Sequence, residues 1–133
     1  MRRTTGTAVV LLALLMAVGC VTPPDPGPAV PTGIAGETAD VLFFWGESCH
    51  ACHQVSPFLD EVAADHPGIR IERIEIHGNP ANTTRYHDVN RALNVTPRGL
   101  PEAVAGGRAF FGAAAIREGL PAAVEAIEAG RRA

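Results

Sequence analysis

The fold is decided by the stretch Phe43-Phe44-Trp45-Gly46-Glu47-Ser48-Cys49-His50-Ala51-Cys52-His53-Gln54-Val55-Ser56-Pro57-Phe58. Apolar residues 41–45 have the length of a buried strand, and residues 46–48 break that strand. Beyond Cys49 the apolar side chains recur at helical spacing, at Val55, Phe58, Leu59, Val62 and Ala63. The pattern predicts a strand, a short turn and a helix that begins near Cys49.

Two cysteines, Cys49 and Cys52, form a Cys-x-x-Cys motif at this helix start. Their sulfurs lie close enough to bridge, and the free N–H groups and positive dipole end of a helix favour a thiolate at the first of them. This spacing indicates a redox-active dithiol. The same letters allow two other interpretations. Cys49 to His53 fits the C-x-x-C-H signature of c-type haem attachment, and Cys49, His50, Cys52 and His53 could be metal ligands.

Residues 1–19 have the organisation of a signal peptide. A basic start, Arg2 and Arg3, precedes an apolar run over residues 8–18 that is too short for a comfortable membrane span. The run ends at Val18-Gly19-Cys20, which resembles the bacterial lipoprotein cleavage box, although Ala17 stands where leucine is usual. We expect cleavage before Cys20 and a lipid on its thiol, with an ordinary secretory signal or an uncleaved anchor as the alternatives.

Residues 20–37, which would start at the lipidated cysteine, are rich in proline and glycine and predict a semi-extended tether. A single folded domain is therefore expected over residues 38–133. Of the 11 basic residues, which are all arginine, removal of Arg2 and Arg3 leaves 9 against 14 acidic residues, a net charge near −5. Because no basic cluster is present, we expect no nucleic-acid partner.

Two further elements are expected after the first helix. Residues 69–77 predict a strand whose isoleucines change phase, which suggests a bulge or a central strand covered on both faces. Asn79 and Pro80 then predict the cap and first turn of a helix that ends near Leu93 and lies on the surface.

The last part of the chain predicts a hairpin and helices. Residues 102–105 and 108–111 are short strands joined by Gly106-Gly107, which fits a two-residue turn. A short helix is expected over residues 113–118, and a last helix that opens at Leu120-Pro121. The predicted order is β-α-β-α-β-β-α.

Over about residues 40–128 the chain resembles the thioredoxin/glutaredoxin superfamily. Four features carry the resemblance: the strand ending in Phe44-Trp45, Cys49-x-x-Cys52 at a helix start, Pro57 five residues after the second cysteine, and Leu100-Pro101 before a hairpin with Gly106-Gly107. The resemblance implies an α/β, thioredoxin-like fold with a four-stranded mixed sheet flanked by helices. It also implies a cis proline beside the dithiol, at Pro101 rather than Pro97.

The chain departs from the thioredoxin pattern at several positions. Phe43 stands where thioredoxins carry a buried aspartate, and the chain has no lysine to partner such an aspartate. Glu47 is a candidate substitute, with a solvated loop glutamate as the alternative. Glu102 follows Pro101 where threonine is common. The dipeptide between the cysteines, His50-Ala51, leaves the redox direction open.

The resemblance implies an extracytoplasmic thiol–disulfide oxidoreductase in which Cys49 attacks and Cys52 resolves the mixed disulfide. Trp45 and Pro101 would shape the substrate groove, and a protonated His50 would add positive charge beside the Cys49 thiolate. The expected partners are protein thiols or disulfides and, through the lipid, a membrane of the cell envelope. We expect a monomer without cofactor or metal.

Two hypotheses of another class remain. One is a metal- or haem-maturation binding protein on a thioredoxin-like scaffold, and the other is an adaptor with a structural disulfide. The haem interpretation is weakened because the only methionines that could be a second axial ligand, Met1 and Met16, lie in the segment expected to be removed. The other histidines, His66, His77 and His87, are expected on the surface of turns and strand ends.

Overall fold

A computed structural model of the protein describes residues 38–133, so the expected signal segment, Cys20 and the tether lie outside the described residues. The elements follow in the order β1 (Val41–Trp45), α1 (His50–Asp65), β2 (Ile71–Glu75), α2 (Pro80–Ala92), β3 (Glu102–Ala105), β4 (Arg108–Phe111) and α3 (Ala113–Arg132). This is the predicted order β-α-β-α-β-β-α. Between residues 38 and 133, no helix has both the length and the apolarity needed to cross a membrane.

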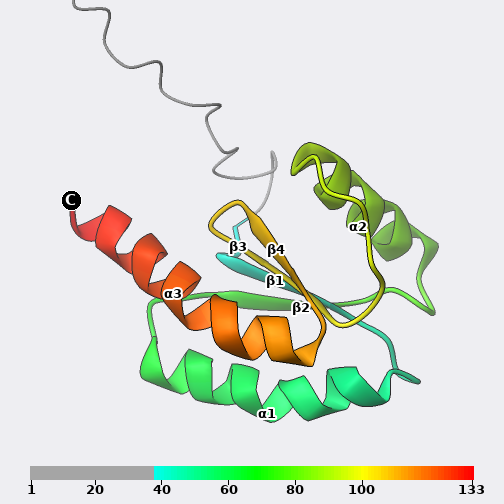
Figure 1. The fold of residues 1–133 in the computed structure, drawn as a ribbon, viewed down its shortest axis with the longest axis horizontal. Coiled ribbons are helices and arrows are strands. Elements are labelled where there is room, and N and C mark those ends of the chain that lie inside the picture. Colours follow the sequence, from blue (N-terminus) through cyan, green and yellow to red (C-terminus); the bar gives the residue numbers. More distant parts are fainter. Residues whose placement is uncertain (1–37) are drawn as a thin grey trace, which may run out of the picture.

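The four strands form one mixed sheet in the order β2-β1-β3-β4. Strand β1 pairs in parallel with β2 and antiparallel with β3, and β3 and β4 form an antiparallel hairpin. Helices α1 and α3 lie on one face of the sheet and α2 lies on the other (Figure 1). The sequence-based fold class, a thioredoxin-like four-stranded mixed sheet flanked by helices, is therefore confirmed.

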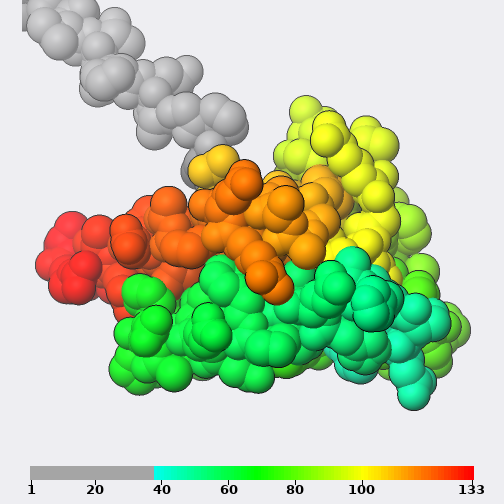
Figure 2. All heavy atoms as spheres, turned by 60° about the horizontal axis from the view of Figure 1, so that its bottom comes forward, coloured from blue at the N-terminus to red at the C-terminus, as the bar shows by residue number. Residues whose placement is uncertain are grey.

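The central strand β1 separates two apolar cores. Because both of its faces are covered, it reads as an unbroken apolar run rather than an alternating one. The first core lies under α1 and α3, which pack side by side in Figure 2, and contains Val41, Phe43, Cys52, Val55, Leu59, Ala103, Ile116 and Leu120 among others. The second core lies under α2 and contains Leu42, Phe44, Ile74, Tyr86, Val89 and Val104.

The strand predicted within residues 69–77 is present as β2 but is shorter than expected. It stands at the edge of the sheet, so the central position, one of the two explanations of its phase change, is wrong. The phase change of its isoleucines has a simpler cause than a bulge. Ile69 and Ile71 pack into the first core, whereas Ile74 and Ile76 pack into the second. Both faces of this edge strand are covered, because a helix lies on each side of the sheet.

The last two predicted helices are a single helix, α3, with Pro121 inside it. A proline within a helix removes one hydrogen bond and costs about 3 kcal/mol. Here Ile116 and Leu120 before the proline and Val124 after it are all fully buried in one core, so the apolar face continues through Pro121. The helix bends partway along its length (Figure 1), and burial on both sides of the bend offsets the cost.

Helix α2 begins and ends close to the predicted positions. The Asn79 side chain accepts hydrogen bonds from the N–H groups of Ala81 and Asn82, at 3.0 and 3.3 Å, so the predicted cap is confirmed. The helix has a polar outer face, as expected of a surface helix. Its inner face buries Tyr86, Val89 and also Asn90, a polar residue.

Candidate active site

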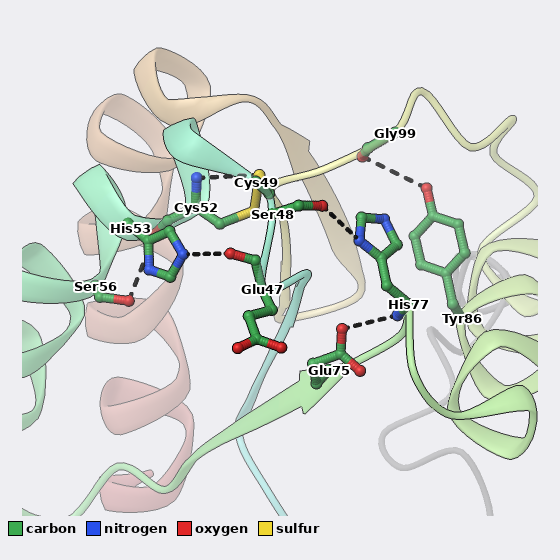
Figure 3. The surroundings of a disulfide bond; sticks show 10 residues. All are labelled: Glu47, Ser48, Cys49, Cys52, His53, Ser56, Glu75, His77, Tyr86 and Gly99. Atoms are coloured by element: carbon green, nitrogen blue, oxygen red, sulfur yellow. Dashed lines mark hydrogen bonds between the residues drawn. A yellow bond between two sulfur atoms is a disulfide. The ribbon is translucent and has the colours of Figure 1, made fainter.

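The two cysteines of the motif form a disulfide, with their Cα atoms 5.2 Å apart (Figure 3). Cys49 is the N-cap residue of α1 and has an extended backbone, as the predicted helix start requires. Its sulfur accepts a hydrogen bond from the Cys52 N–H at 3.1 Å. The sulfur therefore occupies the position at a helix N-terminus where the unpaired N–H groups favour a negative charge.

The two sulfurs differ in their access to solvent. Cys49 is half-buried, whereas Cys52 is fully buried in the first core. An incoming molecule can therefore reach Cys49 but not Cys52. This difference arises because Cys49 precedes the helix, while Cys52 lies one turn further on the face that carries Val55 and Leu59.

Trp45 and Glu47 bracket the turn that leads to the dithiol. Trp45 is half-buried and packs against the first core, and the edge of its ring meets the His53 ring at a centroid distance of 6.0 Å. His53 Nε2 donates to the backbone carbonyl of Glu47, at 2.7 Å. The Glu47 carboxylate is exposed and points away from the sulfurs in Figure 3. Glu47 therefore contributes its backbone to the site, and its candidate role as a substitute for the thioredoxin aspartate has no support in this geometry.

A second group of residues at the end of β2 holds the same turn from the other side. The His77 ring lies against Gly46 so closely that a Cβ on Gly46 would be 2.3 Å from His77 Nδ1. This nitrogen is 3.3 Å from Ser48 Oγ. The Glu75 carboxylate accepts the N–H groups of His77 and Gly78, both at 2.9 Å. Hydrogen bonds from these N–H groups lower the pKa of Glu75.

The roles of His53, His77 and Glu75 were not predicted from the sequence, although His77 was correctly expected at the surface of a strand end. One signal could have indicated two of them. Strands β1 and β2 are parallel, with Trp45 paired to Glu75, so the loops that follow the two strands meet at the same edge. A histidine just after β2 is therefore placed beside the turn that precedes Cys49.

His50 lies on the exposed outer surface of the first helical turn. Its Nε2 atom is 3.2 Å from Gln54 Nε2, one turn further along α1. A side-chain amide nitrogen only donates, so His50 Nε2 accepts in this arrangement. The ring is thus close to Cys49 in sequence but hydrogen-bonded to another residue, and its influence on the thiolate remains a prediction.

The Leu100–Pro101 peptide bond is cis, and among residues 38–133 no other peptide bond is. The expectation for Pro101 rather than Pro97 is therefore confirmed. Pro101 is buried, and its carbonyl accepts the Gly112 N–H at 2.8 Å. Leu100 packs against both cores. Because Cys52 belongs to the first core, Leu100 connects the neighbourhood of the dithiol with the opposite face of the sheet.

A buried polar group lies just beyond this proline. Glu102 is fully buried, and Asn90 Nδ2 donates to its two carboxyl oxygens at 3.1 and 3.0 Å. Burial raises the pKa of Glu102 to about 7, and the hydrogen bonds from Asn90 and Tyr86 oppose that shift. From the sequence, Glu102 was noticed only as a departure from the threonine that is common there.

The metal interpretation receives no support from the geometry. Among the residues that the structure describes, no group of three or more His, Cys, Asp and Glu side chains could hold a metal ion. His53 and His50, two of the proposed ligands, are hydrogen-bonded to Glu47 and Gln54 rather than directed at the sulfurs.

Comparison with known proteins gives partial matches. No protein-family model matches the chain. A thioredoxin of Thiocapsa roseopersicina is 34% identical over 44 residues, which are 32% of this chain and 48% of that protein, so the chain spans about half the length of this curated relative. Among solved structures, a buckwheat glutaredoxin–glutathione complex is 18% identical, with a TM-score of 0.45, over 62% of this chain and 69% of that chain. The chain is thus similar to part of a thioredoxin over these 44 residues.

Proposed function

We propose that the protein is an extracytoplasmic thiol–disulfide oxidoreductase that acts on protein thiols or disulfides. The observation that carries the proposal is the unequal cysteine pair at the start of α1. Cys49 is accessible and accepts a backbone N–H, and Cys52 is buried within bridging distance of it. Such a pair suits an attacking thiolate and a resolving thiol.

The reaction follows from this geometry. In the reducing direction the Cys49 thiolate attacks one sulfur of a substrate disulfide, the substrate S–S bond breaks, and the leaving thiolate takes a proton from solvent. Cys52 then loses its proton and attacks Cys49 Sγ, which expels the second substrate sulfur. Two electrons have moved from the dithiol to the substrate. In the oxidising direction the same steps run backwards, and the Cys49–Cys52 disulfide takes two electrons from a substrate dithiol.

The surroundings of Cys49 support a polypeptide substrate. Half-buried Trp45 and Leu100 offer apolar surface and, like Cys49, pack against the core that contains Cys52. The proposed location in the cell envelope is supported by the sequence of residues 1–20, which combines a basic start, an apolar run and the Gly19-Cys20 box.

A trapping experiment tests the assigned roles. We expect Cys52→Ser, incubated with a disulfide-bonded protein such as insulin, to accumulate a covalent adduct through Cys49, because the resolving thiol is missing. The matched variant Cys49→Ser should form none through the motif, since the other cysteine of the pair, Cys52, is buried. Mass spectrometry without reductant measures how much adduct each variant forms.

The wild-type protein is the control and should turn over without a stable adduct. Equal trapping by the two variants would overturn the assignment of Cys49 as the attacking residue. Trapping by neither variant, with no exchange by the wild type, would overturn the proposed function and favour a structural disulfide.

A further inference from the structure

Glu102 and Asn90 are the two buried polar residues of the part of the chain that the structure describes. Glu102 belongs to β3 and is paired with Phe44 of β1, on the side of the sheet covered by α2. Asn90 belongs to α2 and donates both to the Tyr86 carbonyl, at 2.9 Å, and to the Glu102 carboxyl. A carboxyl group is thus enclosed in an apolar core, with no role in the exchange steps above.

The Tyr86 hydroxyl connects this carboxyl with the segment beside the dithiol. It lies 3.5 Å from the carbonyl oxygen of Gly99, a long distance for a bond donated by a hydroxyl. Burial and, after it, the nearby Glu102 carboxyl raise the pKa of Tyr86, so this carboxyl is a second acceptor that acts on the hydroxyl. A tyrosine hydroxyl has one proton to donate, so the two acceptors compete for it.

Ionisation of Glu102 decides this competition. A carboxylate is a much stronger acceptor than a backbone carbonyl or a neutral carboxyl. When Glu102 is neutral, the Tyr86 proton is available to Gly99. When Glu102 is ionised, the proton is drawn to the carboxylate, and the Gly99 carbonyl loses this donor.

Gly99 opens the short segment that ends at Pro101. Figure 3 draws Tyr86 and Gly99 among the residues that surround the disulfide. Leu100, the next residue, packs against both cores, including the one that contains Cys52. A displacement of Gly99 would therefore move Leu100, which packs against the same core as Cys49.

We infer that Glu102 is a positioning residue for the substrate groove, which holds the Gly99–Pro101 segment through Tyr86 when its carboxyl is neutral and releases it when the carboxyl is ionised. The inference rests on the proposed function, because the groove matters only if a substrate docks beside Cys49. Glu102 itself does not touch the reacting sulfurs.

The groups that face Glu102 determine the pH at which its carboxyl ionises. From α2 the titratable neighbour is Tyr86; β1 presents Phe44 and β4 presents Phe111 as its pair partners. Arg98 lies over the Phe111 ring at 5.9 Å, and the His87 ring meets the Tyr86 ring at a centroid distance of 5.2 Å. Burial is the main cause that raises the pKa of Glu102 to about 7, so the change falls near neutral pH.

The test compares wild type, Glu102→Gln and Tyr86→Phe between pH 5.5 and 8.5. Glutamine has the shape of the neutral carboxyl and cannot ionise. We expect kcat/KM for a disulfide-bonded protein to be equal for wild type and Glu102→Gln at pH 5.5. Above pH 8 the glutamine variant should be about threefold to tenfold faster, the range that one hydrogen bond supplies. The five histidines of the chain are common to both proteins, so their titration cancels in the ratio.

Tyr86→Phe lacks the donor at every pH. It should be about threefold to tenfold slower than wild type at pH 5.5 and equal to it above pH 8. This variant decides the matter if Glu102→Gln does not fold. A small aromatic disulfide, 5,5′-dithiobis(2-nitrobenzoate), needs no groove, and the three proteins should react with it at the same rate at each pH.

An NMR titration of the Gly99 amide separates this inference from the proposed function. The amide shift should follow a midpoint near pH 7 in the wild type and be lost in Glu102→Gln. If exchange persists but Gly99 shows no such titration, or if the rate ratios do not change with pH, the positioning role is overturned. If Gly99 titrates but the wild type exchanges no disulfide, the proposed function fails instead.

Discussion

The side chain of Glu102 is the clearest case of a residue whose environment, rather than its type, sets its behaviour. A carboxylate in an apolar core loses its hydration, and within residues 38–133 no cation is among the causes of the shift in its pKa. The neutral form is therefore favoured in the folded state. The unfolded chain, in contrast, hydrates this carboxyl fully.

The stability of the protein should depend on pH through this residue. Burial raises the pKa of Glu102 from 4.5 to about 7, so between these values the folded state binds a proton that the unfolded state has lost. Stability contributed in this way is complete below pH 4.5 and lost as the pH rises to about 7, by roughly 3 kcal/mol in all.

Glu102→Gln removes that titration. We expect the free energy of unfolding of the variant, minus that of the wild type, to increase by roughly 3 kcal/mol from pH 4.5 to pH 8. Urea unfolding at a series of pH values measures the difference. A difference that does not vary with pH would contradict the raised pKa.

His50 is the residue that could shift the dithiol between a reducing and an oxidising role. A protonated imidazole one position after Cys49 should stabilise the thiolate, and a more stable reduced form makes the disulfide a stronger oxidant. We expect His50→Ala to lower the reduction potential by roughly 10–20 mV, as a single exposed charge near a helix end supplies.

Gln54→Ala is a matched control for this measurement, since it removes the side chain that His50 contacts but leaves the imidazole in place. Equal potentials of wild type and His50→Ala would leave the helix end alone to activate Cys49.

At the scale of elements, the turn between β1 and α1 depends on the loop that follows β2. A Cβ on Gly46 would be 2.3 to 2.9 Å from three atoms of the His77 ring, so the ring has to move if any other residue replaces this glycine. We expect Gly46→Ala to destabilise the protein by about 1–3 kcal/mol, as overpacking does. The measurement is the midpoint of thermal or urea unfolding of the oxidised protein.

His77→Ala provides the test of cause. If contact with the ring is what excludes a side chain at position 46, Gly46→Ala should cost much less in a His77→Ala background, and the two substitutions should be non-additive. Additive effects would show that the glycine is required for another reason.

The elements that could be predicted from the sequence are those whose signals are local. The cap at Asn79, the Gly106-Gly107 hairpin and the helix start at Cys49 each follow from a few adjacent residues. The edge position of β2 and the continuity of α3 through Pro121 could not be predicted in this way. Both depend on which surfaces the rest of the chain covers. A proline predicts a break between two helices, whereas the buried residues on both sides of Pro121 keep α3 continuous.

The candidate site shows the same division. Cys49, Cys52 and Pro101 were identified from a motif and a resemblance, and the structure brings the two cysteines together. His77 and Glu75 approach the dithiol only through the parallel pairing of β1 with β2. The network of Glu102, Asn90 and Tyr86 joins residues that are up to 16 positions apart, and no periodic pattern marks such a contact.

For the whole molecule, the domain boundary near residue 38 stays a prediction. Close to it, the Asp40 carboxylate accepts the Arg70 N–H at 2.8 Å and pairs with Arg131 near the end of α3. We therefore expect a fragment of residues 38–133 to fold alone and to exchange disulfides at the rate of the full chain, measured with insulin; a much slower fragment would contradict the proposed boundary.

We expect the full chain to differ from that fragment in where it is found. If Cys20 carries a lipid, the acyl chains hold the protein on a membrane, and residues 21–37 separate the domain from the surface. We expect the full chain to sediment with membranes and Cys20→Ser either to become soluble or to keep its signal segment, as detergent partitioning and intact mass would show. Cys20→Ala is the matched control for the side chain, and it should behave as Cys20→Ser does because neither can accept a thioether-linked lipid. If both variants fractionate and migrate like the wild type, Cys20 carries no lipid anchor. Any remaining membrane attachment would then be through the apolar run of residues 8–18.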